Sequence, residues 1–92
     1  MLTAFVLVHA VPSRIADLGT ELAEVEGVAE VYSVTGDVDL VAIVRVRRHD
    51  DLAEVVTRHI SGLDGVDRTT TMIAFQAYSR HDLDAMWSLG ME

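Results

Sequence analysis

The 92-residue sequence predicts an α+β fold in which two β-α-β units share one antiparallel sheet. Short runs rich in valine, isoleucine and threonine alternate with two segments whose apolar residues recur at helical spacing. The predicted element order is therefore β-α-β-β-α-β. The two halves also repeat, because a shift of thirty-eight positions superimposes similar residues. This shift aligns Leu18 with Val56, Leu22 with Ile60 and Val25 with Leu63. It also aligns Glu26-Gly27-Val28 with Asp64-Gly65-Val66.

The first β-α-β unit begins at the N-terminus. Residues 2–9 are β-branched, aromatic and apolar and predict a strand that Pro12 ends. A helix follows, with Ser13 placed to cap its start and Gly27 to end it. Its predicted apolar stripe consists of Ile15, Leu18, Leu22 and Val25.

A hairpin connects the two units. Residues 28–35 predict the second strand and residues 38–46 the third. Gly36-Asp37 predicts a tight turn between them, because glycine and aspartate tolerate the backbone angles of a reversal.

The second unit contains a helix that starts near residue 51. Asp51 and Glu54 have capping-box spacing, and Gly62 or Gly65 ends the helix. Residues 69–78 predict the fourth strand, and residues 82–89 a short terminal helix. The apolar stripe of the second helix is Leu52, Val55, Val56, Ile60 and Leu63, with His59 at its edge as a partly buried structural histidine. Leu83, Met86 and Trp87 would pack the terminal helix on its own sheet or a partner's.

This order defines a ferredoxin-like βαββαβ fold, with a four-stranded antiparallel sheet and two helices on one face. No linker or low-complexity stretch interrupts it, so residues 1–92 are expected to form a single domain.

The central strands are apolar on both faces. In the first strand, one face carries Leu2, Ala4, Val6 and Val8, and the other face carries Phe5 and Leu7. In the third strand, one face carries Val38, Leu40, Ala42 and Val44, and the other carries Val41 and Ile43. A sheet with one solvated face would instead alternate apolar and polar residues. We therefore expect a second copy to cover the face without helices in a two-fold homodimer. The pattern does not say which parity faces the helices.

Composition excludes several functions. A net charge of −8, with seven arginines and no lysines, disfavours contact with nucleic acid. Arg45, Arg47 and Arg48 lie beside acidic residues and indicate a solvated strand end. No cysteine is present, no apolar run approaches the ~18 residues of a membrane span, and the N-terminus lacks the basic region of a signal peptide. A cytoplasmic location is expected.

The candidate chemical groups do not form a catalytic or metal-binding motif. His9, His49, His59 and His81 lack the i, i+4 spacing of helical zinc ligands, so neither a metal nor a cofactor is expected. Asp37 and Asp39 flank Val38 at the hairpin. Paired carboxylates can do acid-base work only in a pocket that moves their pKa values apart, and on a tight turn they are more often solvated turn formers. No nucleophile elbow, phosphate loop or dinucleotide fingerprint occurs, and no catalytic residue is assigned.

Two stretches resemble a known family. Residues 27–40 contain a valine-rich strand followed by Thr35-Gly36-Asp37-Val38-Asp39, and residues 65–71 contain glycine-valine before a threonine-rich strand start. Their order and separation resemble the effector-binding (RAM) domain of Lrp/AsnC-type transcription regulators over residues 1–78. Full-length members of that family carry an N-terminal helix-turn-helix. Because the first strand begins at Leu2, the resemblance implies the stand-alone form, without direct DNA binding.

The resemblance implies an oligomer with a ligand site. Family members dimerise through their sheets, and the dimers associate further, as dimers of dimers or rings. Small effectors, commonly amino acids, bind between dimers near the Thr-Gly-Asp loop. The implied contacts are Gly36, Asp37 and Asp39, with a supporting group of Thr69, Thr70 and Thr71.

Three functions stay open at this point. The favoured hypothesis is a homo-oligomeric effector-binding module linked to transcription regulation, with a full-length regulator as a candidate partner. The alternative is a small dimeric enzyme of monooxygenase or isomerase type, using His9, Tyr32 or Trp87 in a pocket between sheet and helices. The third is a purely structural assembly module. An interior filled with Leu, Ile and Val favours the first.

Overall fold

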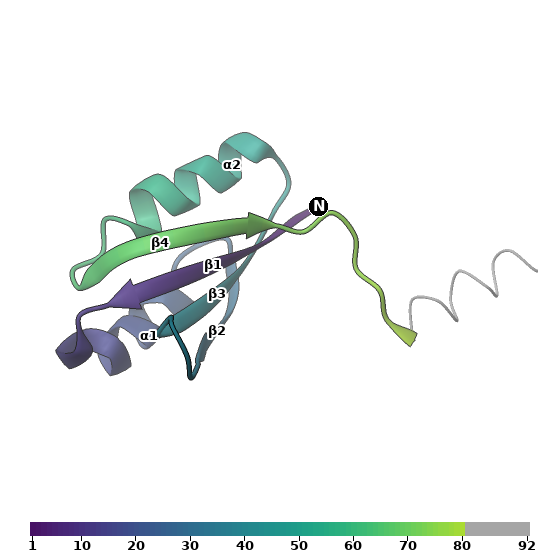
Figure 1. The fold of residues 1–92 in the computed structure, drawn as a ribbon. Coiled ribbons are helices and arrows are strands. Elements are labelled where there is room, and N and C mark those ends of the chain that lie inside the picture. Colours follow the sequence, from purple (N-terminus) through teal and green to yellow (C-terminus); the bar gives the residue numbers. More distant parts are fainter. Residues whose placement is uncertain (81–92) are drawn as a thin grey trace, which may run out of the picture.

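The structure is a computed structural model, and it describes residues 1–80. The element order is β1 (Leu2–Ala10), a 3-10 turn (Pro12–Arg14), α1 (Ile15–Ala23), β2 (Val28–Ser33), β3 (Leu40–Val46), α2 (His49–Glu54), a π-helical turn (Val55–Ile60) and β4 (Val66–Ile73). The predicted βαββαβ fold is confirmed, as Figure 1 shows. The predicted terminal helix over residues 82–89, with Leu83, Met86 and Trp87, lies outside the described residues.

The four strands form one antiparallel sheet in the order β2-β3-β1-β4. β1 and β3 occupy the centre and pair from Leu2↔Val46 to Val8↔Leu40. This order follows from the two crossovers, because each helix carries the chain past a neighbouring strand before it re-enters the sheet.

The core lies between the sheet and the helices. Ala4, Val6 and Val8 of β1 have no exposed surface, and Leu18 and Leu22 of α1 pack against the same cluster. The even-numbered residues of the central strands therefore face the helices. Phe5, Leu7 and Val41 lie on the opposite side, which we call the open face. The structure thereby shows which of the two residue sets faces the helices, which the sequence pattern left open.

The repeat seen in the sequence is also present in the backbone. Gly27 and Gly65 precede β2 and β4 with φ angles of 98° and 99°. The valine after each glycine donates its amide to an equivalent carbonyl, Val28 N to Val25 O at 3.0 Å and Val66 N to Leu63 O at 3.3 Å. The two crossovers thus enter the sheet through the same turn, whose left-handed backbone favours glycine.

The predicted helix caps are wrong. Ser13 lies within the 3-10 turn and makes no capping hydrogen bond at α1, and Asp51 lies inside α2 rather than at its start. Arg14 and Arg48 occupy the N-cap positions, and their side chains form ion pairs and no capping hydrogen bond. Arg14 Nη2 lies 2.6 Å from Glu21 Oε2, and Arg48 Nη2 lies 3.4 Å from Asp51 Oδ1. Pro12 starts the 3-10 turn at the residue before Ser13, so the serine lies inside the turn and not in front of it.

The predicted partial burial of His59 is also wrong. In the π-helical turn Ser61 N donates to Val56 O at 3.0 Å, an i→i+5 bond. Thr57 Oγ1 supports the wider turn by donating to Ala53 O at 2.6 Å. Ile60 is consequently fully buried and His59 is exposed.

The observed strand boundaries differ from the predicted ones at places where the paired strand begins or ends. β2 stops at Ser33 and β3 starts at Leu40, so residues 34–39 form a longer loop than the predicted two-residue turn. β4 begins at Val66 because a bulge between His9 and Ala10 pairs Ala10 with Val66. It ends at Ile73 rather than at residue 78, because the β1 partner runs out near Thr3, whose carbonyl accepts from Ala74 N at 2.9 Å.

Gly36 and Gly65 offer a matched test of the β4 turn. Both have positive φ, but an added Cβ at Gly36 meets nothing within 4 Å, whereas at Gly65 it lies 2.7 Å from Arg14 Cβ. We expect Gly36→Ala to lower the free energy of unfolding by about 1–2 kcal/mol for the left-handed backbone alone. Gly65→Ala should cost clearly more, because the Arg14 side chain must also move. Urea denaturation at one protein concentration measures the difference, and equal losses would contradict the predicted clash.

Candidate functional site

The hairpin loop between β2 and β3 exposes its backbone. Gly36 is exposed with φ 109°, and the space that a side chain would occupy is open. Asp37 beside it is exposed as well, while Val34 N donates to Asp39 O at 3.1 Å and closes the base of the loop. A small molecule could therefore approach the main chain at Gly36 closely, with one carboxylate next to it.

Asp39 is half-buried and holds the loop to β1. Its Oδ2 accepts a hydrogen bond from Ala10 N at 2.8 Å, and its own amide donates to Val8 O at 3.0 Å. These two bonds bracket His9 on β1. Asp37 and Asp39, which the sequence presents as equivalent, thus differ, because the Asp39 side chain is hydrogen-bonded to β1, whereas among residues 1–80 no hydrogen bond or ion pair engages the Asp37 side chain.

The three threonines of β4 are divided between the two faces of the sheet. Thr70 pairs with Leu7 and shares the open face. Thr69 and Thr71 pair with Val8 and Val6, whose side chains face the helices. Strand β1 lies between all three threonines and the hairpin end of β3. The fold thus brings only Thr70 to the face that carries His9 and Leu7.

His9 and Arg68 form a cross-strand pair on the open face. They are register partners, with Arg68 Nε 3.4 Å from His9 Nδ1 and Arg68 Nη2 3.4 Å from His9 Nε2. The sequence proposed His9 only as part of an enzyme pocket and gave Arg68 no role. No local motif joins them, since the two residues are fifty-nine positions apart. The contact between His9 and Arg68 depends on two features: the alternation of side chains along β1, and the bulge at His9/Ala10 that sets the register with β4.

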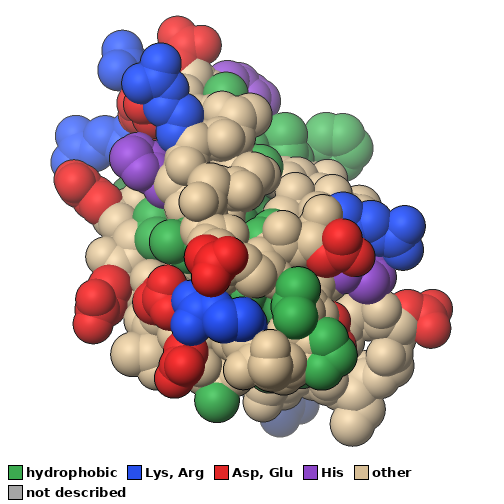
Figure 2. Space-filling view, turned by 90° about the vertical axis from the view of Figure 1, so that its left-hand side faces the viewer, with side chains coloured by type: hydrophobic (Ala, Val, Ile, Leu, Met, Phe, Trp, Pro, Cys, Tyr) green, Lys and Arg blue, Asp and Glu red, His purple; other side chains and the backbone are tan. Residues whose placement is uncertain are grey.

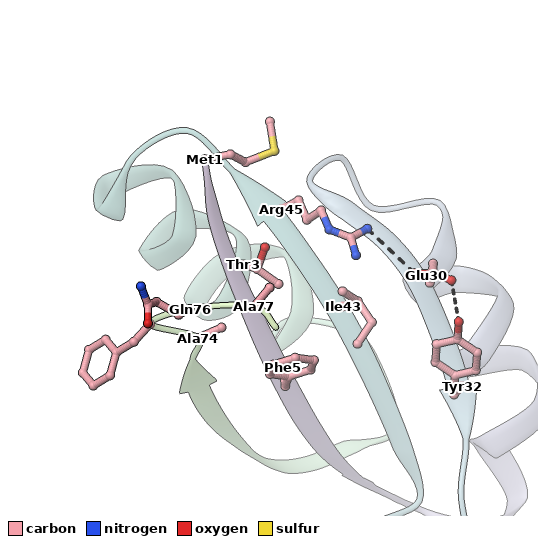
Figure 3. A pocket seen from close by; sticks show the side chains of 11 residues that line it. Met1, Thr3, Phe5, Glu30, Tyr32, Ile43, Arg45, Ala74, Gln76 and Ala77 are labelled. Atoms are coloured by element: carbon pink, nitrogen blue, oxygen red, sulfur yellow. Dashed lines mark hydrogen bonds and ion pairs between the residues drawn. The ribbon is translucent and has the colours of Figure 1, made fainter. Parts of the chain in front are cut away.

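A hollow of about 580 Å³ lies on the same face, toward the opposite end of β3. Figure 3 shows Phe5 and Ile43 at its floor and Tyr32, Glu30 and Arg45 along one side. The Tyr32 hydroxyl donates to Glu30, and Arg45 Nη1 lies 3.7 Å from Glu30 Oε1. The pKa of Tyr32 is raised because the Glu30 carboxylate accepts that proton and its charge disfavours a tyrosinate. Residues 74–77 border the other side.

The enzyme hypothesis required polar residues between sheet and helices. The structure places His9 and Tyr32 on the open face instead, and Trp87 lies outside the described residues. Among residues 1–80 every buried side chain is hydrophobic. No cluster of potential metal ligands occurs in that same range.

The surface charge of the described chain is mixed. Figure 2 shows acidic and basic side chains interspersed over the face in view, without a basic stripe. Arg45 and Arg48, from the arginine cluster at the end of β3, each pair with a carboxylate. Neither helix of the described part has the length and hydrophobicity to cross a lipid bilayer.

The described residues form a small α+β domain with a hydrophobic interior, an apolar open face and an exposed hairpin. Residues 3–83 match the family model of the Lrp/AsnC ligand binding domain. The chain therefore belongs to the Lrp/AsnC ligand-binding domain family. This is a regulatory, non-enzymatic family whose domains oligomerise and bind small-molecule effectors.

Solved and curated relatives agree with this assignment. The structure of TTHA0845 from Thermus thermophilus is 52% identical, with a TM-score of 0.82 over 87% of this chain and 100% of that one. The HTH-type transcriptional regulator FL11 of Pyrococcus abyssi is 31% identical over 75 residues, which are 82% of this chain and 49% of the regulator. The chain thus spans about half the length of the curated relatives it matches.

A third relative was solved with a ligand. The feast or famine regulatory protein from M. tuberculosis, complexed with L-methionine, is 32% identical to this chain. The match covers 87% of this chain and 54% of that one, with a TM-score of 0.73.

Proposed function

We propose that this domain binds an amino-acid effector at the hairpin between β2 and β3 and couples that binding to an oligomer that acts in transcription regulation. The observation that carries the proposal is the open backbone at Gly36 beside the exposed carboxylate of Asp37 and the fixed carboxylate of Asp39. The M. tuberculosis relative complexed with L-methionine supports the class of effector. DNA contact would come from a partner, since a net charge of −8 disfavours a phosphate backbone.

The hairpin suits the ammonium group of an amino acid. The Asp37 carboxylate is exposed to an incoming ligand, and Asp39 keeps an acceptor oxygen beyond the one that binds Ala10 N. A carboxylate that accepts from an ammonium forms a charge-assisted hydrogen bond, which is about twice as strong as a neutral one. Thr70, on the open face, is the threonine best placed to support the ligand, and Thr69 and Thr71 would act from the other face.

The open face is the proposed dimer surface. Phe5, Leu7 and Val41 form its half-buried centre, and Tyr32, Met72 and Phe75 are exposed by 50%, 48% and 100%. A stable interface covers roughly 800 Å² on each partner, which is a modest part of the 6620 Å² of this chain. A second copy related by a two-fold axis would cover these side chains, and Phe75 is one of the residues lining the hollow that could receive its counterpart.

Further assembly follows the same proposal. Dimers would associate as dimers of dimers or as a ring, and a full-length Lrp/AsnC regulator is the proposed partner that supplies DNA binding. The proposed location is the cytoplasm, where such a regulator acts.

Calorimetry with the twenty amino acids tests the effector proposal. We expect at least one to bind the wild-type oligomer and to lose roughly tenfold in affinity in Asp37→Asn or Asp39→Asn, since a charge-assisted hydrogen bond contributes about 1.5 kcal/mol or more. Asp50→Asn is the control, because it removes an exposed charge from the first turn of α2, which follows the other end of β3. Absence of binding by every amino acid would refute the effector class, and unchanged affinity in both hairpin variants would refute the site.

A further inference from the structure

We infer that Arg68, supported by His9, binds the carboxylate of the effector, so that the ligand lies across the end of the sheet between Arg68 and Asp39. This inference rests on the proposed function and adds two residues to it.

The sheet register aligns the three side chains in one row. Asp39, the loop residue just before β3, is tied to β1 on both sides of His9, through Val8 O and Ala10 N. Arg68 on β4 pairs with His9 from the other edge of β1. Since β1 lies between β3 and β4, a carboxylate, an imidazole and a guanidinium follow one another across three adjacent strands.

The row offers a partner for each charged end of a zwitterion. The Asp39 carboxylate can accept a hydrogen bond from an ammonium group, and the planar Arg68 guanidinium can donate two parallel hydrogen bonds to a carboxylate.

The charge of Arg68 is available for a ligand. Arg14, Arg45, Arg48 and Arg58 each pair with a carboxylate. Within residues 1–80, Arg68 has only His9 as a recorded side-chain partner, and it is exposed. Both imidazole nitrogens lie 3.4 Å from the guanidinium, so His9 holds the arginine near the sheet without neutralising it.

The row is separate from the hollow on the same face. The hollow is lined by Thr3, Phe5 and Arg45, toward the end of β3, whereas the row lies at the hairpin end, where β3 begins. A dimer formed over the apolar centre of the open face would leave the row at its margin. A ligand there could contact both the domain and a neighbouring copy.

Calorimetry on the wild-type oligomer and on Arg68→Gln tests the inference. The probes are the amino acid that binds most tightly in the panel and its decarboxylated amine, which lacks the carboxylate. We expect Arg68→Gln to weaken the amino acid at least tenfold and to leave the amine unchanged. Arg68→Lys, which keeps the charge but loses the planar fork, should be intermediate. His9→Gln should reduce affinity by a smaller factor.

Arg47→Gln is the matched control, because it removes the same charge from an exposed arginine just after the far end of β3. Circular dichroism and light scattering of each variant confirm that fold and oligomer persist. If an amino acid binds and Arg68→Gln leaves its affinity unchanged, or weakens the amine equally, the role of Arg68 is refuted while the effector proposal stands. If no amino acid binds the wild type, both proposals fail.

Discussion

Val41→Asp is expected to convert the oligomer into folded monomers. Val41 lies at the centre of the open face, in register with Leu7 on β1 and Tyr32 on β2. In the single subunit its side chain is only half-buried, so an aspartate there can remain hydrated. In a dimer it would be enclosed without a partner charge, which costs several kcal/mol. Each 1.4 kcal/mol is about tenfold in the dissociation constant, so we expect a loss of at least a hundredfold.

Size-exclusion chromatography with light scattering, across micromolar concentrations, measures this effect. Ala42→Asp is the matched control. Ala42 is the next residue, has no exposed surface and faces the helices, so the same carboxylate should unfold the domain rather than dissociate it. A monomeric wild type, or an unchanged oligomer in Val41→Asp, would contradict the proposed interface.

The fold was predictable because local patterns agree with its long-range plan. Leu18 and Leu22 repeat at helical spacing and are both fully buried. Gly27 and Gly65 occupy equivalent positions in the two halves and share one backbone conformation. Such features depend on a few neighbouring residues, so periodicity and turn chemistry are sufficient to predict them.

The boundaries and the pairing on the open face depend on distant contacts. β4 ends at Ile73 because its partner strand ends, although residues 74–78 have the same apolar character. Arg14 fixes the start of α1 through Glu21 and through Asp64, fifty positions away. His9 meets Arg68 only after a bulge sets the register of β1 and β4. Local spacing contains none of these relations, so it does not predict that His9 contacts Arg68.

The family resemblance implied the hairpin residues as ligand contacts, but it did not indicate how their side chains differ in position. Gly36, Asp37 and Asp39 lie together in one loop, as expected, yet Asp39 is committed in part to Ala10 N. The threonine group separates because consecutive residues of a strand point to opposite faces. A sequence motif preserves the order of residues, whereas a site depends on the face to which each side chain belongs.

Ile60→Ala is expected to lower the free energy of unfolding by about 2–5 kcal/mol, whereas His59→Ala should change it by less than about 0.5 kcal/mol. Val55 and Ile60 are both buried and are five positions apart, which matches one turn of a π-helix. A regular α-helix would bring residue 59 back beside Val55 after four positions and make His59 share the core. Urea denaturation of both variants at one protein concentration therefore distinguishes the two helices. A substantial loss in His59→Ala, or a small one in Ile60→Ala, would show that the segment continues as an α-helix, and the packing of the second crossover described above would be wrong.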